Sequence, residues 1–266
     1  MQTQITALFR KLRSAVGLFF GLVLALPCCL AQTPARQIQV LAAADLQPAL
    51  PAIADAYEHA TGIKLAVSYG SSATLATQIL NGDKADLFLG ADFSFPEKIV
   101  AAGLADTTAP EPYAQGTLVL WARKDSPLQP LTQNTLGEGK FATLAIANPE
   151  HAPYGRAAVA ALTWMKLYDN VKPKLVIAEN IAQTAQFVES GNAPLGMISL
   201  TTASTAHFRQ IGTFIRIPTQ TYPAIRQCAV VMKNSDHRAE AHAFLDWLRS
   251  QPIQLNLPKY GLDPVR

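Results

Sequence analysis

The chain has 266 residues, of which 49% are hydrophobic and 15% charged, with 22 basic and 19 acidic side chains. This composition excludes a disordered, coiled-coil or collagen-like chain, because apolar side chains are numerous enough to form a sizeable core. Three cysteines in so long a chain also exclude a small scaffold held by disulfides. The length suits one large domain or two modest ones.

The net charge of +3 comes entirely from the N-terminus. Residues 1–31 contain Arg10, Lys11 and Arg13 and no acidic residue, so residues 32–266 carry no net charge. A balanced chain gives no electrostatic reason to expect a nucleic-acid partner.

The same N-terminal segment is typical of a secretory signal peptide. An apolar run, residues 15–26, follows the basic residues, and the small residues Cys29 and Ala31 come shortly after it. A basic start, a short apolar stretch and a small-x-small site predict export and cleavage after Ala31. The apolar run is short for a membrane span. Cleavage would leave Cys228, in an apolar stretch, as a buried core thiol with no disulfide partner.

From residue 36, short β-branched runs alternate with longer amphipathic stretches. Short apolar runs predict buried strands, and periodic apolar positions predict helices. The first series of predicted strands is 37–43, 64–69 and 86–90, with helices at 46–61, 73–80 and 96–102. Such alternation is typical of a parallel sheet with helices on its faces.

A second series begins at residue 117. Its predicted strands are 117–122, 143–147, 174–178, 195–199 and 228–232, and its helices are 155–167, 181–189 and 239–250. The fold class is therefore α/β, with two Rossmann-like lobes of ordinary domain size. Because no low-complexity linker separates the two series, we expect strands that cross between the lobes to join them.

Four predicted strands end just before a polar residue and a helix start. Each helix start exposes unpaired backbone N–H groups and the positive end of a dipole, so each is a potential anion site. Ligands of open α/β sheets bind at this end of the strands. Polar N-caps are also what any stable helix prefers, so the pattern alone identifies no ligand. The junctions are Asp45 before Leu46, Ser71-Ser72 before Ala73, residues 148–154 before Gly155, and Glu179-Asn180 before Ile181.

Several stretches resemble the periplasmic molybdate-binding proteins of ABC importers, and the resemblance covers nearly all of residues 36–266. It implies a bilobed fold of periplasmic-binding-protein type II, with one lobe at 36–118 plus 226–266 and the other at 119–225. The stretches are Val40-Leu-Ala-Ala-Ala-Asp-Leu46, Tyr69-Gly-Ser-Ser-Ala-Thr-Leu75, Ala85-Asp-Leu-Phe-Leu-Gly-Ala-Asp92, Asn148-Pro-Glu-His-Ala-Pro-Tyr-Gly155, Ala193-Pro-Leu-Gly196 and Lys259-Tyr-Gly261.

The resemblance also implies a ligand, molybdate or tungstate, held between the lobes by neutral hydrogen-bond donors. Ser72 would give its hydroxyl and N–H, Tyr154 and Ile181 their backbone N–H groups, and Ser199 its hydroxyl in place of a tyrosine found in some members. Asp45 is the fifth matching position. The implied protein is a periplasmic monomer that passes its ligand to an ABC permease, with no enzymatic activity and no cofactor. Molybdenum would enter only as the oxyanion.

Asp45 departs from the serine that some family members have, since an ionised carboxylate has no hydrogen to donate and repels a dianion. Three interpretations remain open. The carboxylate caps its own helix and offers the ligand only its N–H, which we favour. It binds in protonated form. Or the true ligand carries a proton, as hydrogen phosphate does.

Three alternative functions also remain. The same fold could bind phosphate, sulfate or thiosulfate. Asp45 and Glu179 could coordinate an oxometalate octahedrally. An exported hydrolase would need a base for Ser72, and the sequence assigns it no histidine partner; Gly-x-Ser-x-Gly, P-loop and dinucleotide-binding motifs are absent.

Overall fold

The computed structural model describes residues 36–265. The signal-peptide prediction for residues 1–31 therefore lies outside the described residues. Within 36–265, none of the helices combines the length and apolar character that a membrane span requires. Cys228 is a buried free thiol, as its apolar surroundings predict.

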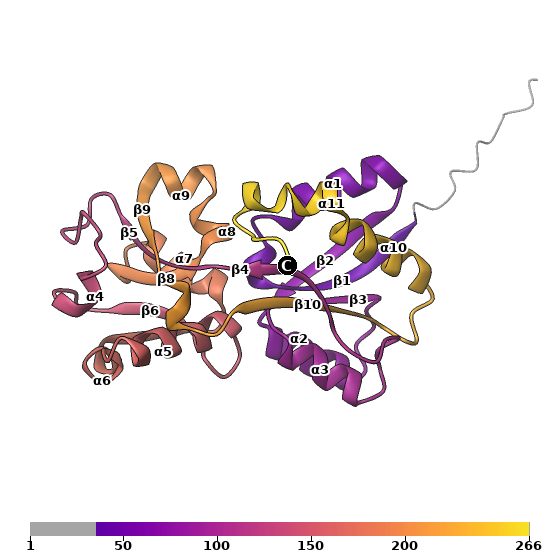
Figure 1. Cartoon of the computed structure of the whole chain (residues 1–266), viewed down its shortest axis with the longest axis horizontal. Coiled ribbons are helices and arrows are strands. Elements are labelled where there is room, and N and C mark those ends of the chain that lie inside the picture. Colours follow the sequence, from indigo (N-terminus) through magenta and orange to yellow (C-terminus); the bar gives the residue numbers. More distant parts are fainter. Residues whose placement is uncertain (1–35, 266) are drawn as a thin grey trace, which may run out of the picture. The chain divides into compact units, whose positions relative to one another are not determined.

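The first of two sheets has the strand order β2-β1-β3-β10-β4 (Figure 1). β1 pairs in parallel with β2 and β3, whereas β10 pairs antiparallel with β3 and β4. The strands are β1 Gln37–Ala43, β2 Lys64–Gly70, β3 Leu87–Gly90, β4 Glu111–Gly116 and β10 Ile225–Val231. We call this sheet with its helices lobe 1.

The second sheet, with its helices, forms lobe 2 and has the order β7-β6-β8-β5-β9. β6 pairs in parallel with β7 and β8, and β5 pairs antiparallel with β8 and β9. The strands are β5 Leu118–Arg123, β6 Leu144–Ala147, β7 Leu175–Ala178, β8 Leu195–Ser199 and β9 Gly212–Arg216.

The expectation of parallel sheets is thus only partly right, because both sheets are mixed. A helix that crosses over a sheet returns the chain parallel to the strand it left. β5 and β10 instead enter their sheets directly from the other lobe, so no such crossover sets their direction. Two edge strands, β4 and β9, had no counterpart among the predicted strands. β4 contains Pro112, which an edge position tolerates.

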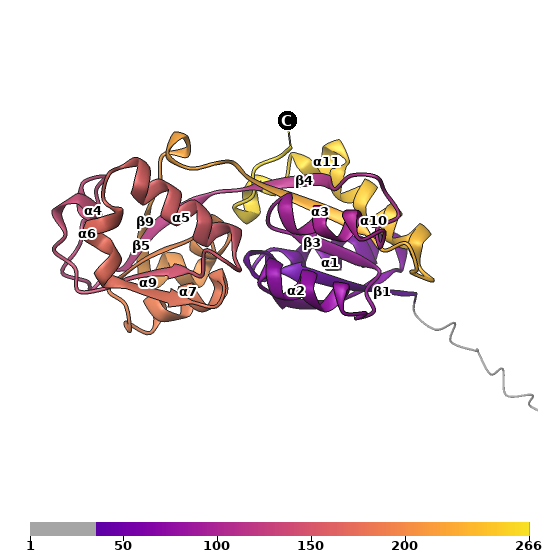
Figure 2. The same cartoon turned by 90° about the horizontal axis from the view of Figure 1, so that it is seen from below.

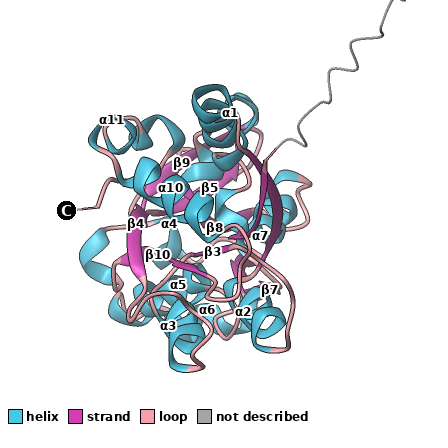
Figure 3. Cartoon of the chain, turned by 90° about the vertical axis from the view of Figure 1, so that its right-hand side faces the viewer, coloured by secondary structure: helices cyan, strands magenta, loops and turns pink. Residues whose placement is uncertain are grey.

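Helices cover both faces of each sheet (Figures 1 and 3). Along β1, Ile38, Val40 and Ala42 pack into one cluster and Leu41 into another, as the alternation of strand side chains requires. In lobe 2, Leu118 and Leu120 of β5 lie in one cluster and Trp121 in the other.

The helices of lobe 1 are α1 Leu50–Thr61, α2 Ser72–Leu80, α3 Ser94–Ala101, α10 Arg238–Arg249 and α11 Gln251–Gln254. Those of lobe 2 are α4 Thr135–Glu138, α5 Pro153–Trp164, α6 Tyr168–Val171, α7 Ile181–Glu189, α8 Leu200–Ala203 and α9 Ala206–Ile211. Short 3-10 turns are η1 Ala44–Leu46, η2 Lys172–Lys174, η3 Thr219–Thr221 and η4 Leu257–Tyr260.

The helix expected from Leu46 begins four residues later, at Leu50. Pro51 is the reason, because proline fits the first turn of a helix and removes a hydrogen bond from its interior. A helix starting at Leu46 would have placed Pro51 in its interior.

Two strand connections join the lobes, as expected (Figure 2). Thr117 alone separates β4 from β5, and residues 217–224 link β9 to β10. The Thr117 hydroxyl donates to Asp263 Oδ2 at 2.8 Å, which ties the C-terminal segment to this crossing. The expected lobe boundaries stay a prediction; sheet membership places Leu118 with lobe 2 and Ile225 with lobe 1.

Gly155 allows the start of α5 to pack closely on β6. A Cβ at this position would collide with the carbonyl oxygen of Ala147. We expect Gly155→Ala to lower the free energy of unfolding by about 1–3 kcal/mol, measured by urea denaturation. Gly137→Ala in α4 is the control, because its Cβ would meet no atom within 4 Å and should leave stability unchanged or slightly raised. Equal stability of the two variants would contradict this explanation.

Candidate functional site

The turn after β1 and the starts of α2, α5 and α7 meet at a small cavity between the lobes. Its volume is about 10 Å³. Four of the five residues expected at the ligand, Asp45, Ser72, Tyr154 and Ile181, are among its lining. The full lining is Ala43, Ala44, Asp45, Gly70, Ser71, Ser72, Ala91, Ala152, Pro153, Tyr154, Asn180 and Ile181.

Ser72 is the first residue of α2 and is 1% exposed. Its Oγ accepts a hydrogen bond from the N–H of Ala91 at 3.1 Å. The adjacent Ser71 caps the helix by accepting from the N–H of Thr74 at 3.1 Å. Because Ser71 supplies the cap, the hydroxyl hydrogen of Ser72 is available to a ligand in the cavity.

Tyr154 and Ile181 occupy the first turns of their helices, where backbone N–H groups have no acceptor within the helix. Asn180 caps α7 by accepting from the N–H of Gln183 at 3.0 Å. The cap leaves the N–H of Ile181, the first residue of α7, directed out of the helix start. Both residues therefore lie where the sequence predicted backbone donors.

Asp45 is 1% exposed and lies in the turn η1. Its Oδ2 accepts hydrogen bonds from the hydroxyl of Tyr154, at 3.1 Å, and from Nε2 of Gln227. Its Oδ1 is buried without a hydrogen-bond partner among residues 36–265. Burial raises the pKa of Asp45 to about 7, although the hydrogen bonds from Tyr154 and Gln227 act in the opposite direction.

The favoured interpretation of Asp45 as a helix cap is wrong. No side chain caps η1, and α1 begins only at Leu50. The carboxyl points instead to Tyr154 and Gln227, so its chemistry is that of a buried acid rather than of a cap.

Ser199 does not line the cavity, contrary to expectation. It is the N-cap of α8, and its Oγ accepts from the N–H of Thr202 at 3.4 Å. Thr201 donates its one hydroxyl hydrogen to the backbone carbonyl of Asp45 at 2.7 Å, so at the 2.8 Å contact between the two hydroxyls Ser199 is the donor and Thr201 Oγ1 the acceptor. Ser199 therefore helps to position Thr201, which bonds to the backbone of the cavity-lining residue Asp45.

Sequence reasoning missed Gln227, which is fully buried in β10. Its Nε2 donates to Asp45, and its Oε1 is a second buried atom without a partner in the described chain. The sequence feature that could have identified Gln227 is a single amide side chain at the start of an apolar strand, because a buried polar side chain requires a hydrogen-bond partner.

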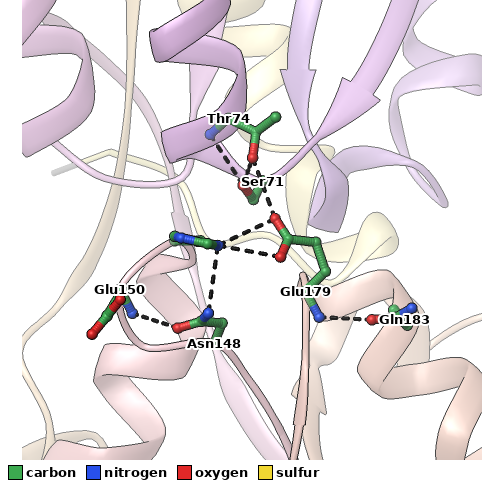
Figure 4. Close-up of polar contacts among 7 residues, drawn as sticks. Ser71, Thr74, Asn148, Glu150, Glu179 and Gln183 are labelled. Atoms are coloured by element: carbon green, nitrogen blue, oxygen red, sulfur yellow. Dashed lines mark hydrogen bonds and ion pairs between the residues drawn. The ribbon is translucent and has the colours of Figure 1, made fainter.

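A second polar cluster joins the lobes beside the cavity (Figure 4). Thr74 of lobe 1 donates to Glu179 Oε1 at 3.3 Å, and the N–H of Ala73 donates to the carbonyl of His151 at 3.2 Å. The Nδ1 of His151 lies 3.2 Å from both carboxylate oxygens of Glu179. Glu179 therefore bonds to Thr74 and His151 beside the cavity and is not part of the cavity lining, whereas Asp45 is.

A family model for bacterial extracellular solute-binding proteins matches residues 38–263. The chain belongs to this family. Among the relatives of this solute-binding protein is the molybdate-binding protein ModA of Azotobacter vinelandii, which is 35% identical over 253 residues, 95% of this chain and 98% of that protein. The molybdate-binding protein ModA of Rhodobacter capsulatus is 32% identical over 261 residues, 97% of this chain and 98% of that protein.

Solved structures agree with the fold of this solute-binding protein. The periplasmic molybdate-binding protein of Azotobacter vinelandii superposes with a TM-score of 0.81 at 29% identity, covering 86% of this chain and 100% of that chain. The sulfate-binding protein SubI of Mycobacterium tuberculosis shares the fold, with a TM-score of 0.71 at 16% identity, over 86% of this chain and 87% of that one. The family resemblance and the bilobed α/β fold inferred from the sequence are confirmed.

Proposed function

We propose that this protein captures molybdate or tungstate between its lobes and delivers the ion to an ABC permease. The cavity carries the proposal, because the starts of three helices from both lobes and the Ser72 hydroxyl converge on it. These are neutral donors, suited to an oxyanion. The names of the relatives from Azotobacter and Rhodobacter support molybdate as the ligand.

Binding would use Asp45, Ser72, Tyr154 and Ile181, with Ser199 in a supporting position. Their attraction for a dianion comes from helix dipoles and N–H groups, since the residues after the proposed signal peptide carry no net charge. The cavity of about 10 Å³ has room for about one water molecule. A tetrahedral oxyanion is larger, so capture and release would require the lobes to move apart at the crossings near Thr117 and residues 217–224.

The other functions fit the geometry less well. Octahedral coordination of an oxometalate would need the carboxylates of Asp45 and Glu179 at the same metal, whereas Asp45 lines the cavity and Glu179 does not. A hydrolase would need a base at Ser72, whereas His151 faces Glu179. Hydrogen phosphate remains the second candidate ligand, because the free Oδ1 of Asp45 could accept its proton.

The proposed role includes export through the N-terminal segment, action as a periplasmic monomer, and no catalytic turnover. It requires no cofactor and no nucleic acid. The permease is the expected macromolecular partner.

Isothermal titration calorimetry with molybdate, tungstate, sulfate and phosphate tests this function. We expect tight binding of the first two ions, and a loss of about 10- to 100-fold in molybdate affinity for Ser72→Ala, because a hydrogen bond to a charged group is removed. Ser190→Ala, at the C-terminal end of α7 and outside the cavity lining, is the matched control and should change affinity little, since its hydroxyl donates to the carbonyl of Phe187. Failure of all four ions to bind would reject the function, and preference for phosphate would favour the second candidate.

A further inference from the structure

A carboxyl in a cavity built for a dianion presents an electrostatic conflict. Asp45 shares the cavity with Ser72 and Ile181, which donate to the proposed ligand. Asp45 takes part in no ion pair among residues 36–265. An ionised Asp45 and a dianion in this enclosed space would repel each other strongly, because charges interact more strongly away from water.

Among the described residues, no basic side chain on the elements packed around Asp45 pairs with it, since Arg156 of α5 pairs with Asp92 and Arg226 of β10 is exposed. Tyr154 faces Asp45 from α5, and Tyr113 of β4 lies close enough for the charge of Asp45 to raise its pKa, after the larger effect of burial. β10 presents the neutral amide of Gln227, followed by Cys228, which burial keeps as a thiol by raising its pKa to about 11. α7, α8 and β2 also pack against η1, the turn that contains Asp45. The residues of α7 and α8 next to η1 are uncharged, and β2 carries Tyr69 and, at its far end, Lys64.

We infer that the site takes up one proton together with its oxyanion, and that this proton resides on Oδ1 of Asp45. The inference rests on the proposed function. Oδ1–H then donates to a ligand oxygen, while Oδ2 continues to accept from Tyr154 and Gln227. Both oxygens of the carboxyl are paired in this arrangement, as buried polar atoms generally are. The ligand class that fits is a fully deprotonated tetrahedral dianion.

Lobe closure connects proton uptake to capture. Tyr154 and Thr201 reach Asp45 from lobe 2, through its carboxylate and its backbone carbonyl. Opening the lobes would separate these contacts and expose the carboxyl to water. Burial favours the neutral acid, so the proton is taken up on closure and released on opening.

Proton uptake is measured by titrating the full mature protein with sodium molybdate at pH 8.5, in two buffers of different ionisation enthalpy. We expect uptake approaching one proton per ion, and an affinity that falls about tenfold per pH unit above pH 7. Asp45→Asn should bind without uptake and with no such pH dependence, because its amide donates without a proton exchange. Asp86→Asn, another buried carboxyl of lobe 1 outside the cavity, should keep the uptake.

The location of the proton is tested by infrared difference spectroscopy of the molybdate complex. A carbonyl band of a protonated carboxyl that disappears in Asp45→Asn supports the inference. Uptake without this band would place the proton on the ligand and overturn it. Tight molybdate binding with neither uptake nor pH dependence would also overturn it while leaving the proposed function intact. Absence of binding by any oxyanion would reject the function itself.

Discussion

Asp45→Asn should become more stable relative to the wild type as the pH rises from 5 to 8, by about 2–3 kcal/mol in the free energy of unfolding. The pKa of Asp45 is about 7 in the folded protein, against 3.8 for an unperturbed carboxyl. Between these values the folded state holds a proton that the unfolded state has lost. The resulting stabilisation is fully present below pH 3.8 and is lost as the pH rises to 7, leaving a buried charge above it. Asparagine has no such proton to lose.

The measurement is urea denaturation of the ligand-free proteins at several pH values. The difference between the free energies of unfolding of the variant and the wild type, taken at each pH, isolates the titration of Asp45. The carboxyls that the substitution does not affect contribute equally to both proteins. Asp86→Asn provides the control, since its carboxylate accepts from Gln39 N–H and from the Ser235 hydroxyl, at 2.6 Å each, and lies away from the cavity. A pH-independent difference between Asp45→Asn and the wild type would show that Asp45 titrates at its ordinary pKa.

Ile181→Pro should reduce molybdate affinity about 10- to 100-fold while α7 remains folded. The substitution removes the backbone N–H at the first position of α7, where proline is well tolerated. The preceding Asn180 has φ −147° and ψ 177°, an extended conformation that a following proline accepts. The loss therefore reports the hydrogen bond that this N–H is proposed to donate to the ligand.

Ile181→Ala separates this effect from side-chain packing. Ile181 is 3% exposed, so both substitutions create space in the core and lower the free energy of unfolding by ~2–4 kcal/mol. The alanine variant keeps its N–H and should bind molybdate nearly as well as the wild type. Circular dichroism confirms folding, and calorimetry gives the affinities. Equal affinity losses in the two variants would assign the effect to packing and remove Ile181 N–H from the ligand set.

Most of the helix starts at the site could be predicted from the sequence because their determinants are local. Asn180 caps α7 through Gln183, three residues further along the chain, and Ser71 caps α2 through Thr74 at the same spacing. β1 spans the predicted residues 37–43. The start of α1 was misplaced although its determinant, Pro51, is equally local.

The partners of polar side chains within the folded lobes were not predictable in this way. Ser199 was expected at the ligand from a family position, yet its hydroxyl bonds to neighbours in α8. The direction of β5 and β10 likewise depends on how the chain crosses between lobes. Neither feature leaves a pattern in the local sequence, because each depends on which surfaces come together.

The sequence by itself determined an α/β chain whose residues 32–266 carry no net charge and whose polar helix starts favour an anion, since capping and hydrophobic periodicity operate over a few residues. Only the tertiary structure decided the state of Asp45. Its partners Tyr154 and Gln227 lie 109 and 182 residues further along the chain. Their packing excludes water from the carboxyl, and that loss of hydration, rather than any neighbour in the sequence, raises its pKa.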